Sequence, residues 1–134
     1  MANEAVIIEL LGNRGDPIRF TCSNTNTIAK GTLLELTDPR TVIANTNDNA
    51  PVVGIAAHEK VALDGATTIS AYTNGIFDML TGAGGKAIGT CVANSATENT
   101  VQAADGSDLL QGSVVGFLME ADGGGVVSSV RILK

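Results

Sequence analysis

The chain has 134 residues, a length typical of one domain that builds a sizeable core without metals or disulfides. Hydrophobic residues make up 44% of it and aromatic residues only 3%, so the core must consist of Val, Ile, Leu and Ala. The net charge of −6, the scattered basic residues and the absence of any apolar run near the ~20 residues of a membrane span exclude nucleic acid and membrane as expected partners.

The first predicted element is an extended segment at the N-terminus. Residues 5–11 read Ala-Val-Ile-Ile-Glu-Leu-Leu, and no convincing helix cap precedes them. The segment is interpreted either as an ordinary first strand or as an arm that adds to a sheet edge on another chain, where main-chain bonds and alternate side chains supply the fit. We take residues 1–12 as this N-terminal arm and residues 13–134 as the body.

A pattern in the middle of the chain returns near its end. Residues 52–57 read Val-Val-Gly-Ile-Ala-Ala, and residues 114–119 read Val-Val-Gly-Phe-Leu-Met. Each run follows a segment that opens with Gly-Thr, at Gly31 and at Gly89. This loose internal repeat predicts two central strands. The glycine inside each run marks a bend or a close backbone approach, which a closing barrel requires.

Most of the remaining chain also reads as short strands. These runs share β-branched or aliphatic residues bounded by Gly, Asn, Asp or Pro. They cover residues 18–22, 32–36, 41–44, 66–73, 76–80, 88–92, 99–103, 113–121 and 126–133. No segment has long helical periodicity. The sequence therefore predicts an all-β fold, a small single-domain β-barrel or sandwich.

Two turns in this series affect the topology. Residues 66–73 alternate in polarity, which places the odd-numbered residues from Thr67 to Thr73 on one face of a strand. Asn74-Gly75 follows and predicts a tight hairpin, with one strand carrying a glycine bulge as the alternative. Further on, residues 105–108 predict a turn, and residues 109–112 are expected to lead directly into the second repeated run.

Few residues are suited to catalysis. The chain has one histidine, His58, and no spacing pairs a nucleophile with a base or nominates paired carboxylates or metal ligands. Residues 81–87 look like a phosphate-binding loop, but Leu80 and Ala87 stand where that pattern needs Gly and Ser or Thr. We therefore expect no enzyme activity, no catalytic residue, and no cofactor or metal.

The redox state of the two cysteines is inferred from the compartment in which the chain is expected to be made. Glu4 stands where a secretory signal peptide needs basic residues, so synthesis in a cytoplasm is expected. Thiols in that compartment stay reduced. Cys22 and Cys91 are therefore predicted to be reduced, buried and inert, with a disulfide between them as the alternative.

A series of glycine and aliphatic motifs spans nearly the whole chain. It consists of Ile-Ala-Lys-Gly-Thr-Leu at 28–33, Ala-Pro-Val-Val-Gly-Ile-Ala at 50–56, Thr-Asn-Gly-Ile-Phe at 73–77, Ala-Ile-Gly-Thr at 87–90, Val-Val-Gly-Phe-Leu-Met-Glu at 114–120 and Val-Arg-Ile-Leu at 130–133. This order resembles the small capsid decoration, or cement, proteins of tailed bacteriophages. It is more loosely similar to the lambda-type head decoration proteins.

The resemblance implies a β-tulip-like subunit with an extended N-terminal arm and no cofactor. Its partners would be the major capsid protein and itself, as a homotrimer over local three-fold axes on the outer surface of the virion. The arm in such proteins contacts the shell, and residues 1–11 match it by position. The candidate capsid-contact residues are Ala5, Val6, Ile7, Ile8, Leu10 and Leu11.

Two other classes stay open at this point. One is a different phage structural module, such as a tail or head–tail connector protein. The other is a carbohydrate-binding or adhesin-like β module, which usually stacks sugars on exposed aromatic side chains. The four aromatic residues of this chain are few and lie within predicted strands, which disfavours that class.

Overall fold

A computed structural model of the chain describes residues 4–9 and 16–134, and within these ranges it is built from short β-strands and one short helix. The elements are β1 (Val6–Glu9), β2 (Ile18–Thr21), β3 (Leu33–Asp38), β4 (Thr41–Ala44), β5 (Val52–Ala56), β6 (Thr68–Tyr72), β7 (Asn74–Thr81), β8 (Cys91–Asn94), β9 (Thr100–Ala103), α1 (Gly106–Gln111), β10 (Val114–Leu118) and β11 (Val127–Leu133). The all-β prediction is confirmed.

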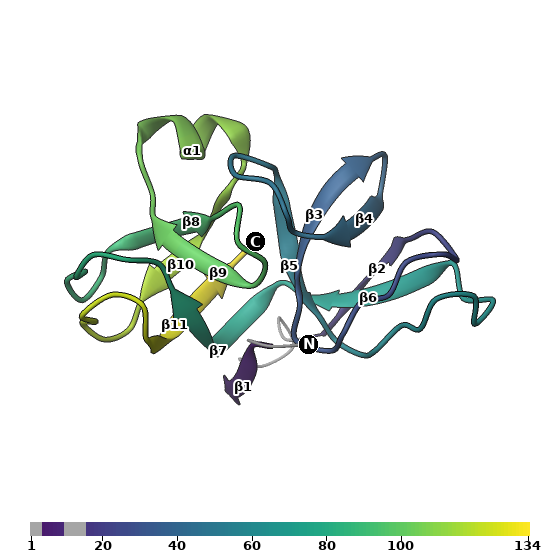
Figure 1. Cartoon of the computed structure of the whole chain (residues 1–134), viewed down its shortest axis with the longest axis horizontal. Helices are drawn as coiled ribbons and strands as arrows, with labels where there is room; N and C mark the ends of the chain where they lie inside the picture. Colours follow the sequence, from purple (N-terminus) through teal and green to yellow (C-terminus); the bar gives the residue numbers. More distant parts are fainter. Residues whose placement is uncertain (1–3, 10–15) are drawn as a thin grey trace.

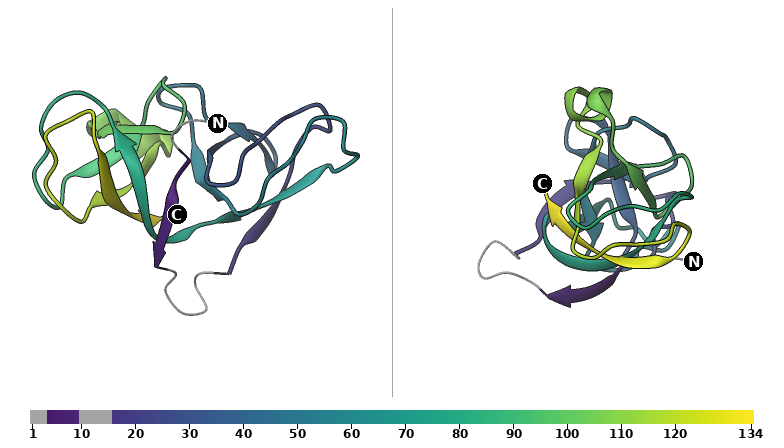
Figure 2. Two further views of the ribbon diagram at one scale, coloured as in Figure 1. Left: turned by 60° about the horizontal axis from the view of Figure 1, so that its bottom comes forward. Right: turned by 90° about the vertical axis from the view of Figure 1, so that its left-hand side faces the viewer.

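The strands form two closed sheets that lie side by side along the long axis of the molecule (Figure 1). The first barrel closes in the order β2-β4-β3-β5-β6. The second runs β7-β11-β10-β8-β9 and is closed by pairing of β7 with β9. Strand β1 adds to the second sheet beside β7, at its outer edge (Figure 2).

The two barrels have the same topology, which confirms the internal repeat and extends it to five strands. In each barrel the first strand pairs antiparallel with the last strand, β6 or β11, and parallel with the third strand, β4 or β9. The second and fourth strands also correspond, because β3 pairs with β4 and β5 as β8 pairs with β9 and β10. The chain is therefore one β unit used twice.

The glycines inside the repeated runs have the role predicted for them. A Cβ at Gly54 would overlap the carbonyl of Tyr72 on β6, and a Cβ at Gly116 would overlap the carbonyl of Arg131 on β11. Both glycines thus lie on the fourth strand of a barrel, where the backbone of the fifth strand comes too close for any side chain.

The two barrels share one of two core clusters, whereas the other cluster lies inside the first barrel. In β3 and β5, neighbouring residues face opposite sides: Leu34 and Ala56 point into the first barrel, whereas Leu33 and Ile55 pack with residues of the second. Both faces of these strands are therefore buried, which explains why the run at 52–57 is apolar without alternation. The barrels form a single domain.

Buried amides also connect the barrels. Asn94 at the end of β8 donates from Nδ2 to Oδ1 of Asn45, which follows β4, at 2.7 Å. The Leu33 backbone N–H donates to Oδ1 of Asn99 at 2.6 Å. All three asparagines are fully buried, so these bonds form away from water and fix how one barrel sits against the other.

The hairpin predicted at Asn74-Gly75 is wrong, and the single-strand alternative describes the chain better. Strand β6 runs on into β7 with only Thr73 between them, and the two strands belong to different sheets. Side chains alternate between buried and half-buried without interruption from Ile69 to Thr81. Because this alternation crosses Asn74-Gly75, the chain passes straight from one barrel into the other instead of turning back (Figure 1).

Candidate interaction surfaces

The predicted N-terminal arm contains strand β1, which is antiparallel to β7, with Val6 opposite Asp78 and Ile7 opposite Phe77. The Ala5 N–H donates to the Gly31 carbonyl at 2.8 Å, and the Ala5 side chain is buried. Ile7 is half-buried and packs against the shared core. This part of the arm therefore contacts its own chain.

Among the candidate contact residues that the structure describes, Val6 has the outward side chain, with 57% of its surface exposed. The side chains of Ala5 and Ile7 pack in or against the core. Leu10 and Leu11, and the side chain of Ile8, lie outside the described residues. The structure thus separates one surface position from two positions that stabilise the fold.

The second surface feature is helix α1, between β9 and β10, which projects from the second barrel (Figure 1). Its N-cap Asp105 accepts the Ser107 N–H at 2.8 Å, and Asp108 closes a capping box by accepting the Asp105 N–H at 2.7 Å. Asp108 is buried and also accepts from the Ser113 hydroxyl at 2.7 Å. The helix ends at Gly112 in the left-handed conformation.

The apolar side chains of α1 point outward. Leu109 is 75% exposed and Leu110 is 89% exposed, whereas the buried residue of the helix is Asp108. A surface helix ordinarily buries its apolar face and exposes its charges, so α1 is reversed. We call Leu109 and Leu110 the leucine pair.

The prediction of a turn at residues 105–108, followed by residues 109–112 leading into the next strand, is wrong, because Gly106–Gln111 form a helix. A helix signal was present: Asp105 and Asp108 have the spacing of a capping box, and Gly112 is a helix-ending residue. It was missed because six residues are too short to show helical periodicity.

Both cysteines are free, as predicted, but their burial differs. Cys22 is buried in the core of the first barrel, where desolvation raises the pKa of its thiol. Cys91, at the start of β8, is exposed, so the prediction that both are buried is wrong. Cys91 is the one exposed residue of β8, and the next residue, Val92, packs in the core.

The remaining reactive residues make structural contacts. His58 is exposed, and its Nε2 accepts the Ser70 N–H at 3.3 Å. The loop at 81–87 turns its lysine inward, with Lys86 Nζ donating to the carbonyls of Gly82 (2.8 Å) and Gly84 (2.7 Å). Asp122 lies 3.7 Å from the same ammonium group.

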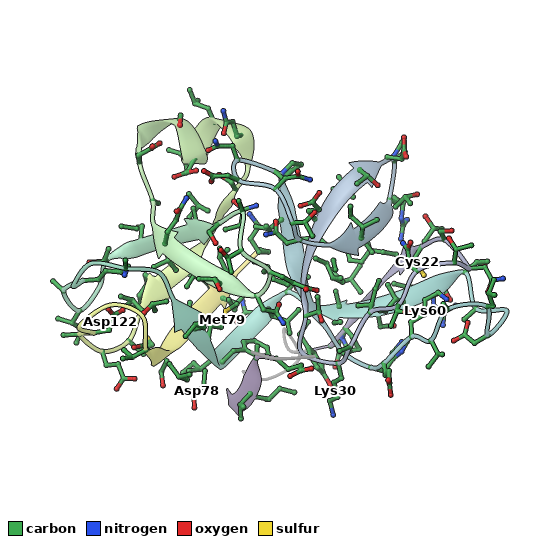
Figure 3. All side chains as sticks on the ribbon, viewed as in Figure 1. Cys22, Lys30, Lys60, Asp78, Met79 and Asp122 are labelled. Carbon is green, nitrogen blue, oxygen red and sulfur yellow. The ribbon has the colours of Figure 1, made fainter. Side chains whose placement is uncertain are left out.

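The first barrel contains a related lysine site. Lys60 is buried, and its Nζ donates to the Asn24 and Val61 carbonyls, each at 3.2 Å, and to Asp64 Oδ1 at 3.1 Å. Lys60 and Lys86 each lie in an isolated bridge at the end of a barrel, Ile28 with Lys60 and Lys86 with Asp122. The two sites are at opposite ends of the molecule (Figure 3).

Within residues 4–9 and 16–134 there is neither a ligand-sized pocket nor a group of three His, Cys, Asp or Glu residues placed to hold a metal ion. The described part of the chain also has no helix long and apolar enough to cross a membrane. Exposed apolar side chains are therefore the candidates for an interaction surface, and they include Val6 on β1 and the leucine pair.

Comparison with known proteins gives no family. No protein-family model matches the chain, and no curated protein sequence matches it significantly.

Proposed function

We propose that this chain is a capsid decoration protein of a tailed bacteriophage. It binds the outer surface of the head, as trimers at local three-fold axes, and stabilises the shell against the pressure of packaged DNA. The major capsid protein and further copies of the chain are its partners in this proposal.

One structural observation gives the main support for the proposal. A rigid two-barrel body has a short strand from the chain terminus laid on the outer edge of one sheet, with Val6 facing outward. Such a strand leaves a surface that another chain can contact by side-chain burial or by strand addition. Four of the motifs that resemble decoration proteins, at 50–56, 73–77, 114–120 and 130–133, fall on strands of the barrels and include Gly54 and Gly116.

The proposed action is physical and needs no reaction. A protein that binds only the assembled, expanded shell stabilises that state by mass action. A trimer that grips several coat subunits gains avidity, so a modest contact from each subunit is sufficient. Closed three-fold symmetry suits the task because the same patch repeats around the axis.

Cosedimentation with heads tests the proposal. We expect the purified chain to bind expanded heads that lack it, to ignore unexpanded heads, and to have the mass of a monomer or trimer by light scattering. Electron microscopy of virions should place it on the head. A chain that binds neither form of head, or that is found on the tail, would contradict the proposal.

Two variants test whether the N-terminal arm contacts the shell. Deleting residues 1–11 is expected to abolish head binding while leaving soluble protein, but it also removes Ala5 and Ile7 from the fold. Val6→Ser changes the outward side chain and spares those two. If both variants decorate heads at full occupancy, the arm makes no contact with the shell.

A further inference from the structure

The two barrels correspond residue by residue at the corner that precedes their second strand. In the first barrel the Gly31 N–H donates to the Ala56 carbonyl at 2.9 Å. In the second barrel the Gly89 N–H donates to the Leu118 carbonyl, also at 2.9 Å. Both glycines have a left-handed backbone, with φ of 86° and 81°, and a threonine follows each of them. Gly31 and Gly89 are therefore the same position of the duplicated unit.

In the first barrel the N-terminal arm covers this corner. The Ala5 N–H donates to the Gly31 carbonyl at 2.8 Å, and Gly31 is buried. A Cβ at Gly31 would lie 2.7 Å from the Ala5 carbonyl oxygen and 2.9 Å from the Ala5 nitrogen. The missing side chain of Gly31 therefore makes room for the backbone of the arm.

In the second barrel the same corner is open. Gly89 is exposed, and a Cβ there would meet no described atom within 4 Å. No group in residues 4–9 or 16–134 donates a hydrogen bond to the Gly89 carbonyl. Beside it stands Ile88, which is 70% exposed and takes the position that Lys30 has in the first barrel. The corner that receives the arm is thus present twice in the chain and covered once.

The N-terminal arm of a second copy is not free to cover the open corner. Each chain has one arm, and Ala5 of that arm already lies on Gly31 of its own chain. An extended segment of a different protein can make the same bond, because a main-chain N–H is available whatever the side chain. An aliphatic residue of that segment would also remove the exposed surface of Ile88 from water.

We propose that the corner at Gly89 binds an extended segment of the coat protein, whose backbone lies on Gly89 as the Ala5 backbone lies on Gly31. A main-chain N–H of the segment donates to the Gly89 carbonyl, and an aliphatic side chain of the segment packs on Ile88. This inference rests on the proposed function and deepens it by naming a contact in addition to β1.

The test adds a side chain that fills the open corner. Gly89→Asn places a Cβ where the backbone of the bound segment would lie, and asparagine tolerates the left-handed backbone better than most residues do. In cosedimentation with expanded, DNA-free heads prepared without this protein, we expect the affinity to fall by at least about tenfold.

Gly65→Asn is the matched control for this variant. Gly65 has a φ of 83°, and a Cβ there would also meet no described atom within 4 Å. The two substitutions therefore impose the same backbone cost, and their thermal midpoints should agree. Gly65→Asn should bind heads like the wild type.

Gly31→Asn tests the comparison of the two corners without heads. Its Cβ would collide with the Ala5 backbone, so its thermal midpoint should fall clearly below that of Gly65→Asn. If the two midpoints agree, the seat of the arm on Gly31 tolerates a side chain, and the comparison with Gly89 is overturned.

The possible failures can be distinguished. If the wild type binds heads and Gly89→Asn binds no worse than Gly65→Asn, the corner is not a shell contact and only this inference is overturned. If Gly89→Asn instead changes the mass of the free protein in light scattering, the corner contacts another copy, which also overturns it. If the wild type does not bind heads, both proposals fail.

Discussion

At the scale of single residues, a buried lysine binds the loop carbonyls at the end of each barrel. Lys60 and Lys86 each turn a charged amine inward onto backbone carbonyls and one aspartate. An ammonium group has three hydrogens and can satisfy several oxygens at once, which suits a loop whose carbonyls have no strand partner. A sequence pattern cannot separate such a lysine from a solvated one, because the distinction depends on which loop oxygens converge on it.

Lys60→Met should therefore be strongly destabilising although it keeps a side chain of similar length. The substitution removes the ammonium donor from the Asn24 and Val61 carbonyls and from the Asp64 carboxylate, which keep only bonds from backbone N–H groups. We expect a loss of about 2–4 kcal/mol in the free energy of unfolding, measured by urea titration. Lys30→Met, at an exposed position, should stay within about 0.5 kcal/mol of the wild type. Equal effects of the two substitutions would show that the inward geometry of Lys60 contributes nothing.

At the scale of elements, sequence reasoning succeeded where a long pattern was available. The glycine-containing runs and the alternation of residues 66–73 fixed the strands and their buried faces, because burial imposes a period that survives in the sequence. Sequence reasoning failed at Asn74-Gly75 and at α1. In the first case tertiary pairing overrode a local turn signal, and in the second six residues were too few to show a period. For the interaction surfaces, the sequence indicated β1 but could not show that Ala5 and Ile7 face inward.

The cap of α1 predicts a pH dependence. Hydrogen bonds from the Ser107 hydroxyl and then from the Ser107 and Asp108 N–H groups lower the pKa of Asp105 below its ordinary value of about 3.9. A depressed pKa in the folded state means that the cap contributes fully above about pH 4 and is lost as the pH falls through the folded-state pKa.

Amide hydrogen exchange measured between pH 3 and 6 can follow this cap. After correction for intrinsic rates, we expect protection at Ser107 and Asp108 to fall toward the acid end in the wild type. Asp105→Asn should flatten this dependence, whereas Asp38→Asn, in the β3–β4 turn, should leave it unchanged. A wild-type profile that does not vary with pH would mean that the carboxylate does not hold the helix.

At the scale of the whole molecule, the shared core predicts that both barrels unfold together. Leu33, Val52 and Ile55 of the first barrel belong to the same buried cluster as Phe77 and Leu118 of the second. Opening one barrel would expose the face on which the other rests. The two barrels are therefore expected to unfold as one cooperative unit and not as two independent modules. The shell-binding role proposed above would gain from this, because resistance to force depends on the rate of unfolding.

Thiol labelling in a Cys91→Ser background tests this coupling, because Cys22 then becomes the single thiol. Cys22 is buried in the first barrel and its raised pKa slows its reaction further, so labelling should await opening of that barrel. Gly116→Ala places a Cβ against the Arg131 carbonyl in the second barrel and should cost at least about 2 kcal/mol. If the barrels open together, Cys22 labelling should accelerate by at least about tenfold at constant pH.

Gly123→Ala is the control for this experiment, because its Cβ would meet no atom within 4 Å, and its labelling rate should match that of the parent. Urea unfolding of each variant gives the stability lost, to be compared with the change in labelling rate. Equal changes in the two quantities are the signature of one unit. A Gly116→Ala protein that is destabilised overall but protects Cys22 as well as its parent would show that the first barrel stays folded on its own, and the single-unit description would then be wrong.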